Sequence, residues 1–405
     1  MGYINFKGIV MVKKIVISTL ITVSAMASIS QNRPIDVNQT VKDYFTEVAV
    51  YGAKNGGWVI KNRKIEPNGE TFVSILTKEK NISNADDTYD DLIGLSFQND
   101  INYTKETYSG ISTLIDFPRH NLDKNETVLM EDIIKRKLIV LNSDYSITNH
   151  IYNISLQDIN ETLNNTIVKI DSVKLSGFYD VEQPLKERVN LSVKSINLKP
   201  LDKKLLGEYF KLNNLSINTK TDKKGKVIDL EYEVSVDLLD SNVDNQHSLI
   251  ENAHLKIKVG NLDAKIYKEL EDMGSKNPEL INDKKIEELS NKLLVSKGLF
   301  IEIIDFNFNN LVDNKNIMGS TKITAKVSLD NVKNSAKEIS INLILALSFL
   351  NIDAKIELSQ EMLTTIMKDP RAMMLAMLPP KKEKNKTVYV IHYSKGKLTI
   401  NGQKL

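Results

Sequence analysis

Hydrophobic and polar residues alternate along much of this chain, and the alternation predicts β-strands. In one clear stretch Tyr232, Val234, Val236 and Leu238 alternate with Glu231, Glu233, Ser235 and Asp237. Successive side chains of a strand point to opposite faces, so this pattern predicts an antiparallel sheet with one buried and one solvated face. Shorter segments of the same kind lie at 58–60, 72–76, 92–97, 167–175, 191–198 and 255–259.

Other segments have apolar residues at helical spacing. We expect helices within 31–56, over 126–137, over 264–273 before Gly274, over 283–297 before Gly298, and over 360–378 after Ser359. Between and after them the pattern predicts further strands at 299–308, 321–328, 339–348, 352–358, 388–393 and 397–400.

This order of elements lacks the regular βαβ alternation of a nucleotide-binding fold. We therefore expect a β-rich α+β protein, with extended antiparallel sheets and a few interposed helices after an N-terminal signal or anchor segment. The expected regions are 1–30 as that segment, 31–137 as α+β, 138–262 as antiparallel β and 263–405 as α+β.

The N-terminus has the pattern of a signal peptide. Lys13 and Lys14 precede an apolar run from Ile15 to Ala27, which ends in the small residues Ala25 and Ala27. The run is shorter than the ~20 apolar residues that usually span a bilayer. We expect either cleavage after Ala27 or retention as a membrane anchor, with the rest of the chain outside the cytoplasm in both cases.

Charge and composition narrow the function classes. Lys and Arg number 54 against 52 Asp and Glu, so no excess of basic residues indicates nucleic-acid binding. The short basic run over 381–384 is interpreted as a solvated loop. There is no cysteine, which excludes disulfides, thiolate metal sites and cysteine nucleophiles.

No catalytic motif is visible. The histidines have no zinc-hydrolase spacing, and the chain contains neither a nucleophile elbow nor a phosphate-binding glycine loop. The histidines are His120, His150, His247, His254 and His392. We therefore assign no catalytic residue and no organic cofactor, and we expect His254, in an alternating strand, to be a surface histidine or one with its hydrogen bonds satisfied, in preference to a metal ligand.

One segment carries oxygen ligands at calcium-loop spacing. Asp240, Asn242, Asp244 and Glu251 occupy positions 1, 3, 5 and 12 of such a loop. Asn245 stands where the glycine is usual, and a strand precedes the loop in place of a helix. A calcium site and a polar hairpin loop therefore remain alternatives.

The expected helix at 360–378 is rich in methionine, with Met362, Met367, Met373, Met374 and Met377. Flexible methionine side chains fill irregular cores and also line surfaces that meet variable partners. The helix is therefore expected either to pack on a sheet or to line an apolar binding surface.

The end of the chain resembles the terminal hairpin of the YdgA/YihF-like bacterial envelope proteins, a family with a domain of unknown function. The resemblance lies in the segment from Tyr393 to Gly402, in the stretch from Asn277 to Leu280, in Gly319 and Ser320, and in a strand at 352–358 that runs into a helix. It implies a periplasmic, sheet-rich body attached to the membrane, and no catalytic residue.

These observations predict an exported, non-enzymatic envelope protein, either in the periplasm or on the inner membrane facing it. We expect it to be a scaffold or carrier for lipid-like or polypeptide partners, with no nucleic acid. The alternatives are a secreted calcium-stabilised binding or adhesion module, and an envelope hydrolase without a readable motif.

Export can be tested with residues 1–40 alone. Fused to a reporter that is active only outside the cytoplasm, this segment should give reporter activity because Lys13, Lys14 and the apolar run direct translocation. An inactive reporter, with the parent protein found in the cytosol, would contradict the expectation.

Overall fold

The computed structural model describes most of the chain beyond residue 55 and single helical residues before it. The residues it describes are 42, 45–46, 49–50, 52–54, 56–78, 92–120, 122, 124–146, 151–163, 165–179, 185–201, 207–243, 246–276, 283–294, 298–313, 316–329, 348–368, 378 and 380–404. The predicted signal or anchor segment at 1–30 lies outside this part, as does the predicted strand at 339–348 except for its last residue, Ser348, which is helical.

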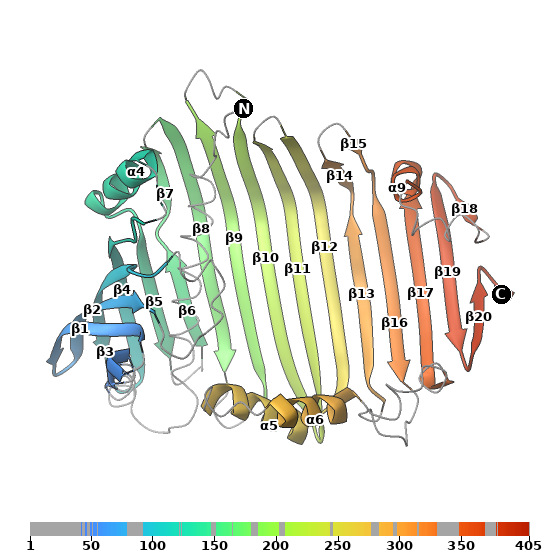
Figure 1. Cartoon of the computed structure of the whole chain (residues 1–405), viewed down its shortest axis with the longest axis horizontal. Helices are drawn as coiled ribbons and strands as arrows, with labels where there is room; N and C mark the ends of the chain where they lie inside the picture. The colour runs from blue at the N-terminus through green and yellow to red at the C-terminus, as the bar shows by residue number, and fades with distance from the viewer. Residues whose placement is uncertain are drawn as a thin grey trace. The chain divides into compact units, whose positions relative to one another are not determined.

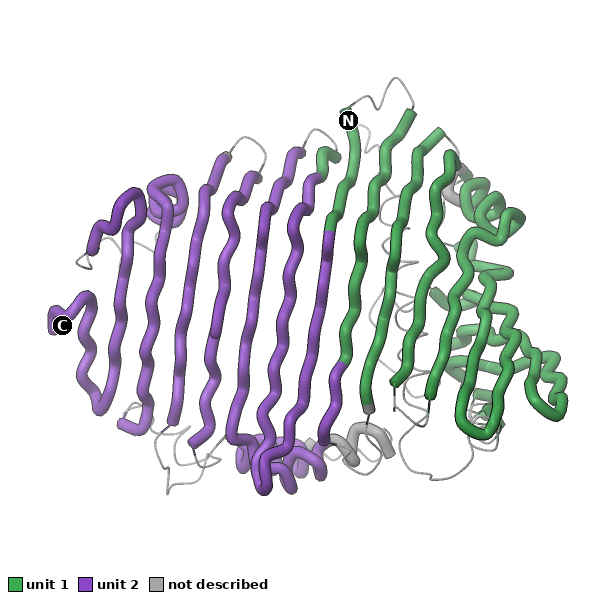
Figure 2. Tube along the Cα trace, turned by 180° about the vertical axis from the view of Figure 1, so that it is seen from behind, with its two compact units in different colours: residues 1–184, 189–213, 241–245 green, residues 185–188, 214–240, 246–405 purple. Residues whose placement is uncertain are grey.

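The chain forms two compact units (Figure 2). Unit 1 comprises Met1–Pro184, Val189–Asn213 and Ser241–Asn245, and unit 2 comprises Leu185–Arg188, Asn214–Asp240 and Gln246–Leu405. The chain is a β-rich α+β protein with a large antiparallel sheet, which confirms the predicted fold class. The region boundaries predicted after residues 137 and 262 stay predictions.

The described part of unit 1 is a succession of antiparallel strands, with the helix α4 between β4 and β5. The strands pair in the order β1, β2, β3, β4, β5, β6, β8 and β7. Their bounds are β1 Gly57–Glu66, β2 Gly69–Thr77, β3 Ser96–Tyr103, β4 Thr107–Asp116, α4 Lys124–Lys135, β5 Val140–Ser146, β6 Ile151–Leu156, β7 Ile159–Leu163, β8 Thr166–Tyr179 and β9 Glu187–Pro200.

The core of unit 1 is formed by strands along which buried and exposed side chains alternate. In β3 and β4 every second side chain is buried, as the two-residue period of a strand requires. Phe72, Ile101, Tyr103 and Tyr108 pack together there with Phe45 from the helical residues before β1.

Unit 2 contains the longest strands. Its elements are β10 Tyr209–Lys224, β11 Val227–Val243, β12 Gln246–Asp263, α5 Ala264–Lys276, α6 Asp283–Leu294, β13 Phe300–Phe308, β14 Asn310–Asp313, β15 Asn316–Ile317, β16 Thr321–Leu329, β17 Leu350–Ser359, α9 Gln360–Ile366, β18 Lys381–Glu383, β19 Lys386–Ser394, β20 Lys397–Ile400 and β21 Gln403–Lys404. The first residues of β10 and the last of β11 belong to unit 1.

Within unit 2, strands β12, β13, β16, β17, β19 and β20 pair antiparallel in that order. Helices α5 and α6 lie at one end of these strands and α9 lies at the other (Figure 1). Both α5 and α9 begin at a capping residue: Asp263 Oδ1 accepts from the backbone N–H of Ile266 at 3.0 Å, and Ser359 Oγ accepts from that of Met362 at 3.2 Å.

Two apolar clusters lie at the two ends of this sheet. Where β12 ends, Ile228, Leu262, Ala264 and Leu299 are buried with Tyr267 of α5 and Leu293 of α6 packed against them. Where β17 ends, a second cluster forms around Leu358, Met362, Tyr389 and Ile400. The helices therefore cover the ends of the strands.

The helix predicted at 360–378 is shorter than expected. α9 ends at Ile366, because Met367 is its C-cap and donates its backbone N–H back to Leu363. Pro370 disfavours helical geometry at the residue before it, which is consistent with an early end. Met362 packs on the sheet, and Met373, Met374 and Met377 lie outside the described residues.

Other boundaries also differ from the predictions, two of them at glycines. Residues 92–94 form a turn, and β3 starts only at Ser96, because Gly94 has φ +106° and cannot lie within a regular strand. α5 continues past the predicted stop at Gly274 to Lys276. Among the residues described, none of the helices has the length and hydropathy needed to span a membrane.

The packing of α9 predicts the effect of one truncation. Met362 is only 6% exposed and contacts the cluster around Leu358 and Tyr389. Met362→Ala should lower the free energy of unfolding by about 2–5 kcal/mol, because it leaves a cavity in that cluster. Thr364→Ala, on the exposed side of the same helix, should change it by no more than about 0.5 kcal/mol in the same denaturant titration. Equal losses for the two variants would contradict this packing.

Candidate functional site

One face of the unit 2 sheet is apolar between its two end clusters. Cross-strand registers place Ile303 opposite Ile257, Ala325 opposite both Ile303 and Ala354, and these side chains share one face. We call this the apolar face; its side chains are Tyr232, Val234, Leu255, Ile257, Ile301, Ile303, Phe306, Ile323, Ala325, Val327, Ile352 and Ala354. Tyr232 and Val234 of β11 are assigned to it because Glu233, between them, contacts His254 and Lys256 on the opposite face.

The apolar face belongs to neither end cluster and stays partly exposed. None of its side chains counts among the buried residues, and Ile301 and Tyr232 are 49% and 41% exposed. Scattered exposed apolar residues are common, but a contiguous run over several strands is typical of a binding surface. The alternation in the sequence predicted a buried face, whereas here that face is buried only at its ends.

The opposite face of the same strands is charged. Lys258 Nζ lies 3.1 Å from Asp229 Oδ2, and Lys256 Nζ lies 3.2 Å from Glu233 Oε2. Further pairs join neighbouring strands: Lys326 with Glu302, Lys386 with Glu357 and His392 with Asp353. Opposite charges alternate across this face, so its charged side chains pair with one another between neighbouring strands.

On this charged face His254 of β12 contacts a carboxylate on each of the two neighbouring strands. Its Nε2 lies 2.9 Å from Glu233 Oε1, and its Nδ1 lies 3.0 Å from Asp305 Oδ2. Both carboxylates have a second cation nearby, Lys256 for Glu233 and Lys322 at 3.7 Å for Asp305. His254 is therefore a histidine with partners on both ring nitrogens.

These contacts shift three pKa values. The pKa of His254 is raised, first by its hydrogen bond to Glu233 and then by the one to Asp305. The pKa of Glu233 is lowered, chiefly by the hydrogen bond from His254. For Asp305, burial pulls the pKa upward, but the hydrogen bonds from His254 and Asn307 outweigh it and lower the pKa.

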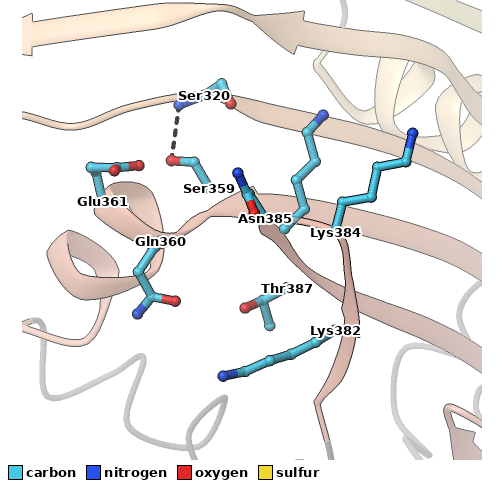
Figure 3. A pocket seen from close by; sticks show the side chains of 9 residues that line it. Ser320, Ser359, Gln360, Glu361, Lys382, Lys384, Asn385 and Thr387 are labelled. Carbon is cyan, nitrogen blue, oxygen red and sulfur yellow. Dashed lines mark hydrogen bonds between the residues drawn. The ribbon is translucent and has the colours of Figure 1, made fainter.

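A polar pocket of about 560 Å³ lies at the α9 end of the sheet (Figure 3). We call it the hairpin pocket; it is lined by Ser320, Ser359, Gln360, Glu361, Lys382, Lys384, Asn385, Lys386 and Thr387. Figure 3 shows Lys382 and Lys384 on the β18–β19 hairpin, across the pocket from the first turn of α9.

Hydrogen bonds fix the wall of the pocket that α9 forms. Ser359 Oγ accepts from the backbone N–H of Ser320 at 3.1 Å as well as from that of Met362. Gly319 allows this approach: its φ is +81°, and a Cβ there would lie 2.2 Å from Ser359 Oγ. The pKa of Glu361 is lowered by its own backbone N–H and by the Ser359 hydroxyl, so its charge is held at that wall.

The predicted calcium ligands lie in different settings. Asp240 Oδ1 is 3.0 Å from His247 Nε2, and Glu251 is in β12 opposite Asn310. Asn242 donates its side-chain amide to the Gly207 carbonyl at 2.8 Å, and Asp244 lies outside the described residues. The calcium site stays a prediction.

Within the described ranges, no three histidine, aspartate or glutamate side chains are grouped so that they could hold a metal ion. The sequence analysis missed the hairpin pocket because it interpreted 381–384 as a solvated loop. In the structure Lys381–Glu383 is the strand β18, paired with β19. The signal available in the sequence was the turn at Lys384 and Asn385 between two short β-segments.

The contacts of His254 predict a pH-dependent stability. A raised pKa means that the stabilisation is complete below the ordinary pKa of histidine and is lost as the pH rises through the raised value. His254→Gln should therefore cost more stability at pH 6 than at pH 9, with a difference of about 1 kcal/mol for this partly exposed group. In a Glu233→Gln and Asp305→Asn background the same substitution should show no such difference, and an equal loss at both pH values in the parent would contradict the assignment.

The comparisons with known proteins identify a family but no individual relative. No curated protein and no solved structure matches the chain. A family model described as a bacterial protein of unknown function (DUF945) matches residues 141–405, which include all the strands of the apolar face and the hairpin pocket. The chain therefore belongs to this DUF945 family of bacterial proteins.

Proposed function

We propose that this protein is a non-enzymatic envelope protein that carries or holds lipid-like molecules on the apolar face of unit 2. The observation that carries the proposal is the continuity of this face over β11, β12, β13, β16 and β17, with side chains that remain partly exposed. Water contact with these side chains is unfavourable by roughly 25 cal/mol per Å², so a ligand that covers them is stabilised.

The chemistry of the face favours an acyl chain over a polypeptide. Among its side chains only Tyr232 carries a polar group. A polypeptide laid across it would bring backbone N–H and C=O groups that need hydrogen-bond partners, whereas an acyl chain brings none. Ala325 pairs with Ala354 near the middle of the face, and these two small side chains leave more room above the sheet than branched residues would.

Export and envelope location belong to the same proposal. They are supported by the signal-peptide pattern over 13–27 and by the resemblance to the YdgA/YihF-like proteins. Membership of a bacterial family of unknown function is compatible with this location. If the N-terminal segment is retained, it holds the body at the inner membrane.

A single charge on the apolar face tests the proposal. Binding of dodecyl maltoside, a neutral amphiphile, can be measured by calorimetry below its micelle concentration with the full chain. Ala325→Glu should weaken binding by about tenfold or more, because a carboxylate would have to be desolvated under the acyl chain. Thr324→Glu is the matched control: it is the next residue of β16, on the charged face opposite Lys355, and should leave the affinity unchanged.

Melting temperatures of the two variants show whether each remains folded. Equal affinities in the parent and Ala325→Glu would contradict the proposal, as would a parent that binds no amphiphile. A polypeptide that co-purifies with the protein and is displaced by Ala325→Glu, without bound lipid, would favour the polypeptide partner in its place.

A further inference from the structure

The hairpin pocket and the apolar face lie on the same side of the unit 2 sheet. Thr387 is the cross-strand partner of both Leu358 and Lys382, so these side chains share one face. Leu358 in turn lies on the face of Ile356, Ala354 and Ile352, since strand side chains alternate. The pocket therefore lies at the end of this side where β16 begins and β17 ends, beyond the end cluster around Leu358 and Tyr389.

We propose that the hairpin pocket binds the anionic headgroup of an amphiphile whose acyl chain lies along the apolar face. The inference rests on the proposed function for the acyl chain and adds the chemistry of the headgroup. The headgroup is a phosphate or carboxylate attached to a lipid, and the residues that recognise it are Lys382 and Lys384.

The charge of the pocket supports an anion. Three lysines line it against one glutamate, and the carboxylate of Glu361 is held at the far wall by the Ser359 hydroxyl and its own backbone N–H. The third lysine, Lys386, is already paired: its Nζ lies 3.6 Å from Glu357 Oε2 on the charged face. Within the part of the chain that the structure describes, Lys382 and Lys384 form no ion pair, and both side chains are exposed.

The remaining lining groups suit a phosphate or carboxylate. Ser320, Gln360, Asn385 and Thr387 bring hydroxyl or amide groups, which donate hydrogen bonds to such oxygens. Charge-assisted hydrogen bonds of this kind are stronger than neutral ones, so a charged headgroup is favoured over a hydroxyl-only one.

The length of the face matches an acyl chain. From Thr321 beside the pocket to Val327, β16 advances six residues, or about 20 Å at roughly 3.3 Å per residue. Thr321 is buried next to the end cluster, and the apolar face itself takes up the four-residue step from Ile323 to Val327, or about 13 Å. One leaflet of a bilayer has a hydrocarbon thickness of about 15 Å, half of the roughly 30 Å core. A single acyl chain whose headgroup is in the pocket therefore passes the end cluster over its first ~7 Å and lies on the apolar face with the rest of its length.

The experiment compares three probes on the full chain: dodecyl phosphate, dodecyl maltoside and inorganic phosphate. The parent should bind dodecyl phosphate about tenfold more tightly than dodecyl maltoside, and inorganic phosphate far more weakly than either. The double variant Lys382→Gln with Lys384→Gln should lose about tenfold in affinity for dodecyl phosphate and none for dodecyl maltoside.

Lys395→Gln with Lys397→Gln is the matched control. It removes the same charge from the exposed β19–β20 hairpin, at the other end of β19, and should leave all three affinities unchanged. If it weakens the binding of dodecyl phosphate as much as the pocket variant does, net charge explains the preference for the anionic amphiphile and the pocket assignment is wrong.

The remaining outcomes separate this inference from the proposed function. Equal binding of the two amphiphiles by the parent overturns the headgroup site and leaves the apolar face as the binding surface. Failure of both amphiphiles to bind contradicts both. If inorganic phosphate binds as tightly as dodecyl phosphate, the pocket is a site for free anions and the assignment of a lipid headgroup to it is wrong.

Discussion

The two-residue period of the long strands is the constraint on which the structure depends. Successive side chains of a strand must point to opposite faces, so the long strands of unit 2 such as β12, β13 and β16 present mainly polar and charged residues on one side and apolar residues on the other. The registers keep these sides in phase from strand to strand, as in the pairs Lys258–Glu302 and Val259–Ile301. One shift by a single residue would exchange the two faces.

The side chains of the two faces find their partners in different ways. On the charged face neighbouring strands hold each other through pairs such as His254 with Glu233 and Asp305, so polar groups find partners within the sheet. On the apolar face burial depends on what lies above the strands. α5, α6 and α9 bury the ends of that face, and the middle keeps contact with water. Buried apolar contacts are therefore concentrated at the ends of the sheet, and the middle is the part that we propose binds a ligand.

Local pattern was enough to predict the strands with clear alternation and the fold class. The segment 231–238 was identified as a strand from its sequence, and it lies within β11. Depth of burial was not predictable, because the same alternation in 323–327 describes a covered face and an open one equally well. The length of α9 depends on a cap at Met367, and methionine is not a typical cap residue.

The candidate site was harder to predict than the fold. The hairpin pocket unites residues from three places in the chain, near 320, at 359–361 and at 382–387, and no short motif joins them. The lysines of 381–384 are ordinary surface residues in sequence, and only pairing with β19 places Lys382 and Thr387 on one face. By contrast the calcium spacing is visible in the sequence alone, yet Asp240 already contacts His247.

The central claim is that the apolar face of unit 2 holds an amphiphile in the cell. Native mass spectrometry of the full chain, purified without added detergent from the organism that makes it, measures this most directly. The account predicts a bound species whose mass corresponds to a single anionic lipid and which is depleted in Ala325→Glu but retained in Thr324→Glu. A parent protein that carries no lipid, or one whose lipid is unaffected by Ala325→Glu, would contradict the account.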